Sequence, residues 1–320
     1  MLLKFWGTRG TIPSPLRPDQ VEQKVKDVLN TAAQEKIDLT DPRAIEAFTA
    51  GLSLAGSTVG SNTTCVTVEL ENDLIIFDAG SGIRELGEAL MDKTNDFAQK
   101  FGFYRGEGHA HMFFTHTHWD HIQGFPFFLP AYDPDRHFTI AIIGRDRQTR
   151  NLEDIFSMQM QREYFSVPLE KMGARMTFFA PETTHYTTPI TGNKVVTLRH
   201  NHPGGAYSYR IEGEGKIFVY CTDVEHGDGI DPSIVALSRD ADLLIHDAQY
   251  TPEELKRKRG WGHSSWEQAV EVAEQAGVKK LALFHHDPEH TDSFLFGMEK
   301  ECQRRFPEAF PSREGMEIEI

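Results

Sequence analysis

Residues 115–121, with the sequence THTHWDH, carry four side chains of types that can bind metal ions. They directly follow the apolar stretch MFF, so we expect a strand to lead into them. His116 and His118 are two residues apart and point the same way in an extended chain, and Asp120 and His121 come next. A metal ion needs convergent ligands at about 2.0–2.2 Å. This segment therefore predicts a metal centre at the end of a strand.

Residues of the same kinds recur at other predicted strand ends and helix starts. They are His200 and His202 after KVVTLR, Asp223 after IFVYCT, His263 before a predicted helix, and His285 and His286 after LALF. Strand ends and helix starts are where α/β folds gather their sites. Five separate segments with this pattern indicate one site built from distant parts of the chain.

The elements that must position these residues are strands first joined by turns and later separated by helices. Strands are expected at 2–5, 65–70, 74–80, 112–114, 139–144, 176–180, 194–200, 206–212, 216–223, 242–248 and 280–286. Helices are expected at 83–91, 147–160 and 292–305, and from a Ser264 or Ser265 cap to about Gly277. His109 and His111 are expected to face solvent. The pattern predicts an α/β fold with two β-sheets covered by helices.

One domain covering residues 1–320 accounts for this pattern, with a helical insertion at about 16–60. Val21, Val25 and Leu29 recur at helical spacing, and Pro42 is expected at the first position of a second short helix. The insertion either decorates the fold, covers the site as a lid, or serves as a dimer arm. A homo-oligomer is therefore among the expectations.

The amino-acid composition limits the cellular compartment and the binding partners that we expect for this chain. Lys and Arg total 33 against 48 Asp and Glu, so the formal charge is −15, which argues against a broad nucleic-acid surface. The three Cys residues do not make a disulfide scaffold. No apolar run approaches the roughly 18 residues of a membrane span, and the first residues lack the apolar region of a secretory signal. We expect a cytoplasmic protein without membrane contact.

The segment THTHWDH resembles the HxHxDH signature of the metallo-β-lactamase fold, an αββα sandwich, and the later His, Asp and His segments follow in that superfamily's order. Within the superfamily, the chain is most similar to the phosphodiesterase branch that includes ribonuclease Z and cyclic-phosphate phosphodiesterases. Gly262-His263-Ser264 resembles the GHS/T motif of that branch, and His285 follows 22 residues later. The resemblance covers nearly the whole chain apart from the insertion.

Residue by residue, the resemblance implies two metal sites that share one ligand. His116, His118 and His202 would hold the first metal ion, while Asp120, His121 and His285 would hold the second; Asp223 would bridge them. His263 would contact phosphate, and Asp78 would orient a ligand histidine. His200 competes with His202, although the sequence HPGG favours His202, and His286 competes with His285, which follows the strand immediately.

Chemistry supports a dinuclear hydrolase. Two divalent cations about 3.5–4 Å apart could share a hydroxide able to attack phosphorus, and Asp120 and Asp223 would help to hold these cations. His263 then either contacts the phosphate or acts as general acid. No Cys stands at a ligand position, so imidazole and carboxylate groups make up the donor set. Zn suits this set, and Mn and Fe remain alternatives.

The leading hypothesis is a phosphodiesterase that acts on a small anionic substrate, a cyclic nucleotide or cyclic phosphate. The first alternative is an RNA endonuclease like ribonuclease Z, a family that carries a tRNA-binding arm between the segments equivalent to His202 and Asp223. Only 20 residues separate those two positions here. The second alternative is an ester or thioester hydrolase of the lactonase or glyoxalase II type, against which the GHS segment weighs. The third alternative is a non-hydrolytic member of the superfamily, either a di-iron redox protein or a binding protein of a cofactor pathway. Di-iron redox relatives usually carry Glu where this chain has His118.

For several other residues near these motifs, the sequence leaves two possible roles open. Trp119, Phe125, Phe127 and Phe128 either stack on a nucleobase or form core and pocket wall. Arg9 and the basic run 256–259 either reach phosphate or have no role in the site. His226 either contacts the substrate or has no role in the site.

Overall fold

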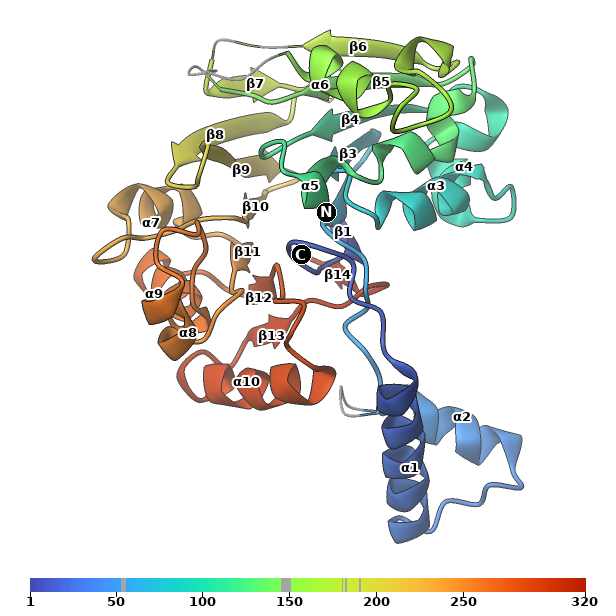
Figure 1. Cartoon of the computed structure of the whole chain (residues 1–320), viewed down its shortest axis with the longest axis vertical. Helices are drawn as coiled ribbons and strands as arrows, with labels where there is room; N and C mark the ends of the chain where they lie inside the picture. Colours follow the sequence, from blue (N-terminus) through green and yellow to red (C-terminus); the bar gives the residue numbers. More distant parts are fainter. Residues whose placement is uncertain (53–55, 145–150, 180, 182, 190) are drawn as a thin grey trace.

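The computed structural model describes residues 1–52, 56–144, 151–179, 181, 183–189 and 191–320. Two seven-stranded mixed sheets lie face to face, and helices cover both outer faces (Figure 1). This arrangement confirms the predicted αββα layers. The predicted helical residues 147–150 and strand residue 180 lie outside the described part of the chain.

The first sheet has the strand order β14-β1-β2-β3-β4-β5-β6. Its strands are β14 (Glu317–Glu319), β1 (Leu2–Gly7), β2 (Cys65–Leu70), β3 (Asp73–Phe77), β4 (His109–Phe113), β5 (His137–Ala141) and β6 (Arg175–Phe179). The strands from β14 to β3 pair antiparallel, and those from β3 to β6 pair parallel.

The second sheet has the order β13-β12-β11-β10-β9-β8-β7. Its strands are β13 (Ala309–Pro311), β12 (Leu281–Phe284), β11 (Leu243–Asp247), β10 (Lys216–Cys221), β9 (Ala206–Gly213), β8 (Lys194–His200) and β7 (His185–Thr187). Because β8 and β10 both pair antiparallel with β9, they run in the same direction. β11 and β12 continue that direction in parallel, so the carboxyl ends of these four strands meet at one edge.

The helices belong to separate layers. Those of the first half are α3 (Ile83–Met91), α4 (Asp96–Lys100), α5 (Trp119–Ile122) and α6 (Leu152–Gln159), with 3-10 turns η1 (Phe103–Arg105), η2 (Phe125–Phe127), η3 (Leu129–Tyr132) and η4 (Leu169–Lys171). Those of the second half are α7 (Pro232–Ser238), α8 (Pro252–Arg257), α9 (Trp266–Ala276) and α10 (Asp292–Arg305). Ser265 caps α9, as one of the two predicted candidates, and Gly277 ends it at φ 67°.

The main core lies between the sheets. Phe77 of β3 packs on Tyr209 of β9 and Tyr220 of β10, with ring centroids 5.2 and 4.9 Å apart. A second apolar cluster joins the second sheet to α7, α9 and α10. The three cysteines are buried in these cores, as small apolar side chains would be. His111 is also fully buried, so the prediction that it faces solvent is wrong: β4 is a central strand, and its neighbours cover this side chain.

Two helices extend away from the sheets: α1 (Pro18–Gln34) and α2 (Pro42–Ala50), which we call the helical arm (Figure 1). Within α1 only Ala32 is buried. At the base of the arm, Lys24 Nζ lies 3.0 Å from Asp292 Oδ2, at the start of α10. Both helices fall in the predicted insertion, and the assignment of residues 1–320 to one domain stays a prediction. No helix in the described ranges combines the length and apolar character that crossing a membrane requires.

The packing of Phe77 gives a stability prediction. Phe77→Ala leaves a cavity between the sheets and lowers the free energy of unfolding by about 3–5 kcal/mol. Val25→Ala, at a half-exposed position of the arm, changes it by less than about 0.5 kcal/mol. Urea denaturation followed by circular dichroism measures both. Equal effects for the two variants would contradict the assignment of the core.

Candidate metal centre

All seven residues predicted to hold metal come together at one edge of the two sheets. His116 and His118 follow β4, Asp120 and His121 lie in α5, and His202, Asp223 and His285 follow β8, β10 and β12. Within the described residues, His116, His118, His202 and Asp223 form one group whose ligand atoms lie within 4.8 Å of one another. Asp120, His121 and His285 form a second such group. These two groups match the two predicted metal sites, and a further set of Asp223, Asp247, His263 and His285 overlaps both of them.

The carboxylate of Asp223 lies between the two groups. Its Oδ2 is 3.7 Å from His116 Nε2 and 3.8 Å from His202 Nε2, in the first group. Its Oδ1 is 3.2 Å from His121 Nε2 and 3.3 Å from His285 Nε2, in the second. One carboxylate oxygen thus faces each group, the arrangement that a bridging ligand requires.

Hydrogen bonds on the far side of the histidines fix how the rings point. His202 Nδ1 lies 2.8 Å from the carbonyl oxygen of Gly262, and His285 Nδ1 lies 2.8 Å from Gln249 Oε1. His121 Nδ1 lies 2.9 Å from Oδ2 of Asp78. Each of these oxygens accepts a hydrogen bond from Nδ1, which leaves the lone pair of Nε2 directed into the cluster. The position of Asp78 agrees with the orienting role that the resemblance implies.

Electrostatics favour the cation-binding form of some donors and oppose it at His121. Burial lowers the pKa of His121, but the carboxylates of Asp223 and Asp120 outweigh it and raise that pKa well above its ordinary value. Burial lowers the pKa of His116 well below its ordinary value, so the imidazole is neutral. Burial alone would raise the pKa of Asp223, but the adjoining His285 and His121 outweigh it and hold that pKa well below its ordinary value. His116 Nε2 and His121 Nε2 are buried without a hydrogen-bond partner among the described residues. Buried polar atoms of this kind need a partner, and a divalent cation supplies one.

Three residues of this centre have left-handed backbone conformations. Asp78, Asp223 and His285 have φ values of 57°, 57° and 61°. Asp78 and His285 come directly after β3 and β12, and Asp223 comes two residues after β10. Non-glycine residues adopt this region at a cost of about 1–2 kcal/mol each. The strain turns the chain sharply at the strand ends and explains why the predicted strands 74–80, 216–223 and 280–286 stop early.

The structure distinguishes between the histidines that compete for two of the ligand positions. His200 and His286 belong to neither group. His200 is buried beneath the site, with both ring nitrogens unpartnered within the described chain. His286 Nε2 instead lies 3.0 Å from the carbonyl oxygen of Ser312 and donates to it. The geometry therefore favours His202 and His285.

His263 stands beside the cluster and has its own partner. Its Nδ1 lies 2.7 Å from Oδ2 of Asp247, at the end of β11. The other oxygen of Asp247 accepts hydrogen bonds from the backbone N–H groups of Gln249 and Ser264. Burial would lower the pKa of His263, but the Asp247 carboxylate raises it to about 9. Asp247 thus holds the ring in place and favours its protonated form.

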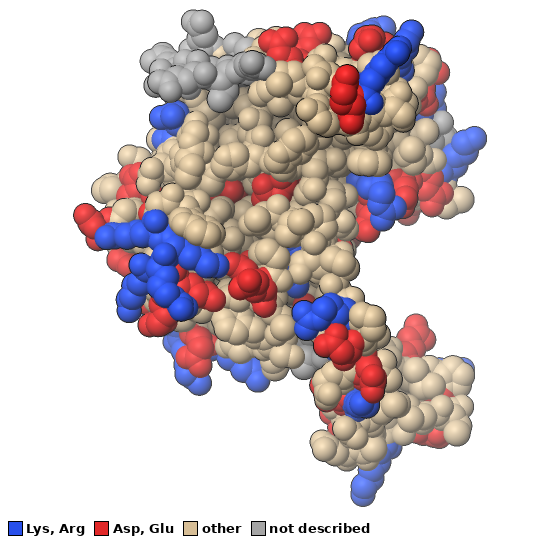
Figure 2. Space-filling model, in the orientation of Figure 1, with Lys and Arg blue, Asp and Glu red and all other residues tan. Residues whose placement is uncertain are grey.

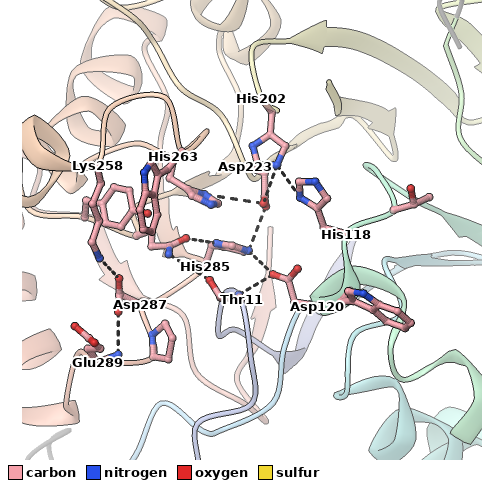
Figure 3. Close-up of a pocket in the computed structure, with 16 residues that line it drawn as sticks. Thr11, His118, Asp120, His202, Asp223, Lys258, His263, His285, Asp287 and Glu289 are labelled. Atoms are coloured by element: carbon pink, nitrogen blue, oxygen red, sulfur yellow. Dashed lines mark hydrogen bonds and ion pairs between the residues drawn. The ribbon is translucent and has the colours of Figure 1, made fainter. Parts of the chain in front are cut away.

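A cavity of about 630 Å³ opens above these residues (Figure 3). Its walls include members of both metal groups together with His263, and further out Lys258, Asp287 and Glu289. Lys258 Nζ lies 3.0 Å from Asp287 Oδ2 across the cavity wall. The basic side chain is therefore paired with an acidic one at the cavity, so the basic run does not present a free phosphate-binding cation there.

Other residues singled out from the sequence lie in different places. Arg9 is buried, and its guanidinium donates to the carbonyl oxygens of Gly60, Asp287 and His290, so it braces loops. Of the aromatic residues, Trp119 lines the cavity, whereas Phe125 and Phe128 are fully buried core. Phe127 packs on Phe165, with ring centroids 5.4 Å apart. His226 is buried with its Nε2 3.3 Å from that of His246.

Sequence reasoning did not find some of the supporting residues. The backbone N–H of Thr11 donates to Asp120 Oδ2 over 2.7 Å, and the hydroxyl of Tyr220 donates to Asp78 Oδ2 over 3.1 Å. Gln249, which holds His285, has only one sequence signal, its place just after a strand end. These contacts join segments far apart in the chain, so no local pattern announces them.

Comparisons with known proteins agree with this geometry. The model of the β-lactamase superfamily domain matches residues 75–286. Ribonuclease Z of Haloarcula marismortui is 27% identical over 277 residues, covering 73% of this chain and 84% of that protein. Ribonuclease Z of Porphyromonas gingivalis is 24% identical over 313 residues, covering 84% of this chain and 97% of its own length.

Three solved structures share the fold across the whole chain. The short form of human tRNase Z aligns with a TM-score of 0.57 and 19% identity, covering 100% and 99% of the two chains. A diphosphatase of the PhnP family aligns at 0.58 with 16% identity, over 100% and 97%. Zn²⁺-bound PqqB of Methylobacterium extorquens aligns at 0.63 with 14% identity, over 100% of both. The chain belongs to the β-lactamase superfamily, and it is a hydrolase of the metallo-β-lactamase fold.

Proposed function

We propose that this hydrolase is a dinuclear metal-dependent phosphodiesterase that cleaves a small substrate, a cyclic nucleotide or cyclic phosphate. The observation that carries the proposal is the position of Asp223 between two ligand groups, with the His263–Asp247 pair in the same cavity. His116, His118 and His202 would hold one ion, and Asp120, His121 and His285 the other. Asp223 would be shared.

The donor set fits divalent cations. Five imidazoles and two carboxylates converge, and unpartnered Nε2 atoms of His116 and His121 point to missing ligands. Zn suits imidazole and carboxylate ligands, with Mn and Fe as alternatives. When bound, two such ions activate water at neutral pH and stabilise negative charge on phosphoryl oxygens. Two cations against two carboxylates leave the site with a formal charge of about +2, which attracts a phosphodiester anion.

The protein's own residues then orient and protonate the substrate. Asp247 occupies Nδ1 of His263, so Nε2 is the atom available for the substrate. In the reaction, water adds its oxygen to phosphorus and gives up one proton to solvent, while the bond from phosphorus to the ester oxygen breaks. The leaving oxygen takes a proton, which Nε2 of His263 supplies as general acid; His263 afterwards regains its proton from solvent. His263 is catalytic in this scheme, and Asp247 positions it.

A second candidate function is RNA cleavage of the ribonuclease Z type. The names of the relatives favour it and weaken the expectation that nucleic acid is not a partner. Against it, the segment between His202 and Asp223 contains only β9, β10 and the short turn between them, with no added arm. The helical arm lies elsewhere, and residues 16–60 carry five Lys or Arg against seven Asp or Glu.

Surface charge also favours the small substrate. Figure 2 shows Lys and Arg gathered at the left edge of this face and otherwise interspersed with Asp and Glu, including on the helical arm. Binding of long nucleic acids depends on phosphate contacts from many basic residues. Hydrolysis of an ester or thioester is a weaker alternative, because Gly262-His263-Ser264 and its spacing to His285 resemble the phosphodiesterase branch.

The ligand assignment gives the first prediction for the site. His202→Gln and His285→Gln each lower the metal content below the wild-type level of about two ions per chain. His200→Gln and His286→Gln are matched controls that keep about two ions, because neither histidine reaches a ligand group. Asp223→Ala loses both ions and activity, since each group loses its shared oxygen donor. Metal analysis of zinc-loaded protein by mass spectrometry measures the content; depletion in the controls would disprove the assignment.

The role of His263 gives a second prediction. His263→Ala keeps its metal content and lowers kcat about 10²–10⁴-fold on a cyclic nucleotide, because the leaving oxygen is strongly basic. On bis(p-nitrophenyl) phosphate the loss is smaller, because p-nitrophenolate leaves without a proton.

Steady-state kinetics of both substrates, with wild type and His263→Ala, makes the comparison. Equal losses on the two substrates would assign His263 to phosphate contact instead of proton transfer. An unchanged kcat on both would remove it from the mechanism. Cleavage of a tRNA precursor, with no turnover of small phosphodiesters, would establish the ribonuclease reading in place of the proposed one.

A further inference from the structure

Two tryptophans at the cavity remain largely exposed to solvent. Trp119 and Trp261 have exposed fractions of 64% and 63%, and both line the cavity that contains the metal groups. Large aromatic side chains are usually mostly buried. Two indoles left uncovered at one cavity indicate a surface that a ligand covers.

The segments that hold the metal ligands also fix these tryptophans. Trp119 is the first residue of α5 and stands between His118 and Asp120. Trp261 precedes Gly262, whose carbonyl oxygen accepts a hydrogen bond from His202. The backbones beside both indoles are therefore tied to the predicted metal centre.

The carboxylate of Glu225 fixes the backbone of the loop that carries Trp261. The two oxygens of Glu225 accept hydrogen bonds from the backbone N–H groups of Gly260 and Gly262, each over 2.8 Å. The N–H of Trp261 itself donates to the carbonyl oxygen of Lys258. A loop held in this way presents the indole without a large ordering cost on binding.

The surrounding wall is aromatic and carries little free positive charge. Lys258 Nζ lies 4.5 Å from the ring centre of Tyr250 and 5.9 Å from that of Trp261, while Asp287 neutralises its charge. Glu289 adds a negative charge to the same cavity. This outer wall disfavours a ligand with many phosphates and suits an uncharged planar group.

We propose that Trp119 and Trp261 form a subsite for the base of a nucleoside phosphodiester, whose phosphate lies at the metal centre. The proposal rests on the proposed function, because it names the substrate class of the same site. Aromatic side chains stack on every base, so the subsite selects nucleosides over base-free phosphodiesters and discriminates weakly among bases.

Binding of a product-like pair tests the subsite without turnover. Ribose 5-phosphate carries a hydroxyl group at the carbon where adenosine 5′-monophosphate carries adenine, and isothermal titration calorimetry of the zinc-loaded protein gives the Kd of each. We expect the nucleotide to bind about 10-fold more tightly or better. Trp119→Ala and Trp261→Ala each weaken nucleotide binding about 10-fold and leave ribose 5-phosphate within about two-fold of wild type.

Conservative and control variants complete the design. Trp119→Phe and Trp261→Phe keep most of the preference for the nucleotide, because a phenyl ring still stacks. Phe127→Ala removes a comparably exposed ring that does not line the cavity, and it leaves both Kd values unchanged.

Three results would overturn the subsite: equal affinity of wild type for the two ligands, no binding of the nucleotide, or equal weakening of both ligands in the alanine variants. Turnover of adenosine 3′,5′-cyclic phosphate is measured in parallel. Base preference without turnover would defeat the phosphodiesterase proposal while supporting the subsite. Turnover without base preference would support the phosphodiesterase proposal and defeat the subsite.

Discussion

The buried carboxylate of Asp223 requires positive charge or hydrogen-bond donors around it, and the surrounding structure supplies groups of this kind. A carboxylate removed from water is costly unless charge or hydrogen bonds compensate it. Five imidazole rings lie within 4.0 Å of it, and all five are themselves buried: those of His116, His121, His202, His263 and His285. The rings cannot all carry protons at such close range, so cations are the natural source of the missing positive charge.

The need to surround this carboxylate explains why both sheets supply donor residues at the same edge. No single strand end can supply Asp223 together with the six other donors around it. β4 with α5 supplies four from the first sheet, and β8, β10 and β12 supply three from the second. The packing of Phe77 against Tyr209 and Tyr220 fixes the distance between the sheets. The apolar core therefore sets the geometry of the polar site, and it contacts that site through the hydroxyl of Tyr220, which donates to Asp78.

The sequence predicted what is local and left open what depends on distant contacts. THTHWDH announces its four donors within six residues, and most central strands and helices follow from hydrophobic pattern and caps. The choice between His200 and His202 depends on where a loop turns, which the sequence does not show. Thr11, Gln249 and Tyr220 support the centre through contacts across the fold. The short edge strands β7, β13 and β14 were also missed, since three residues carry too little pattern.

The left-handed backbone at Asp78, Asp223 and His285 means that folding and function make opposite demands on these positions. Glycine adopts such a conformation freely, so it is the residue that backbone energetics alone would select there. Each of these side chains is instead retained in a conformation that disfavours it. A sequence drifting under selection for stability alone would move toward glycine at all three places and lose its donors. At these three turns the chain therefore gives up backbone stability for a side chain that builds the centre.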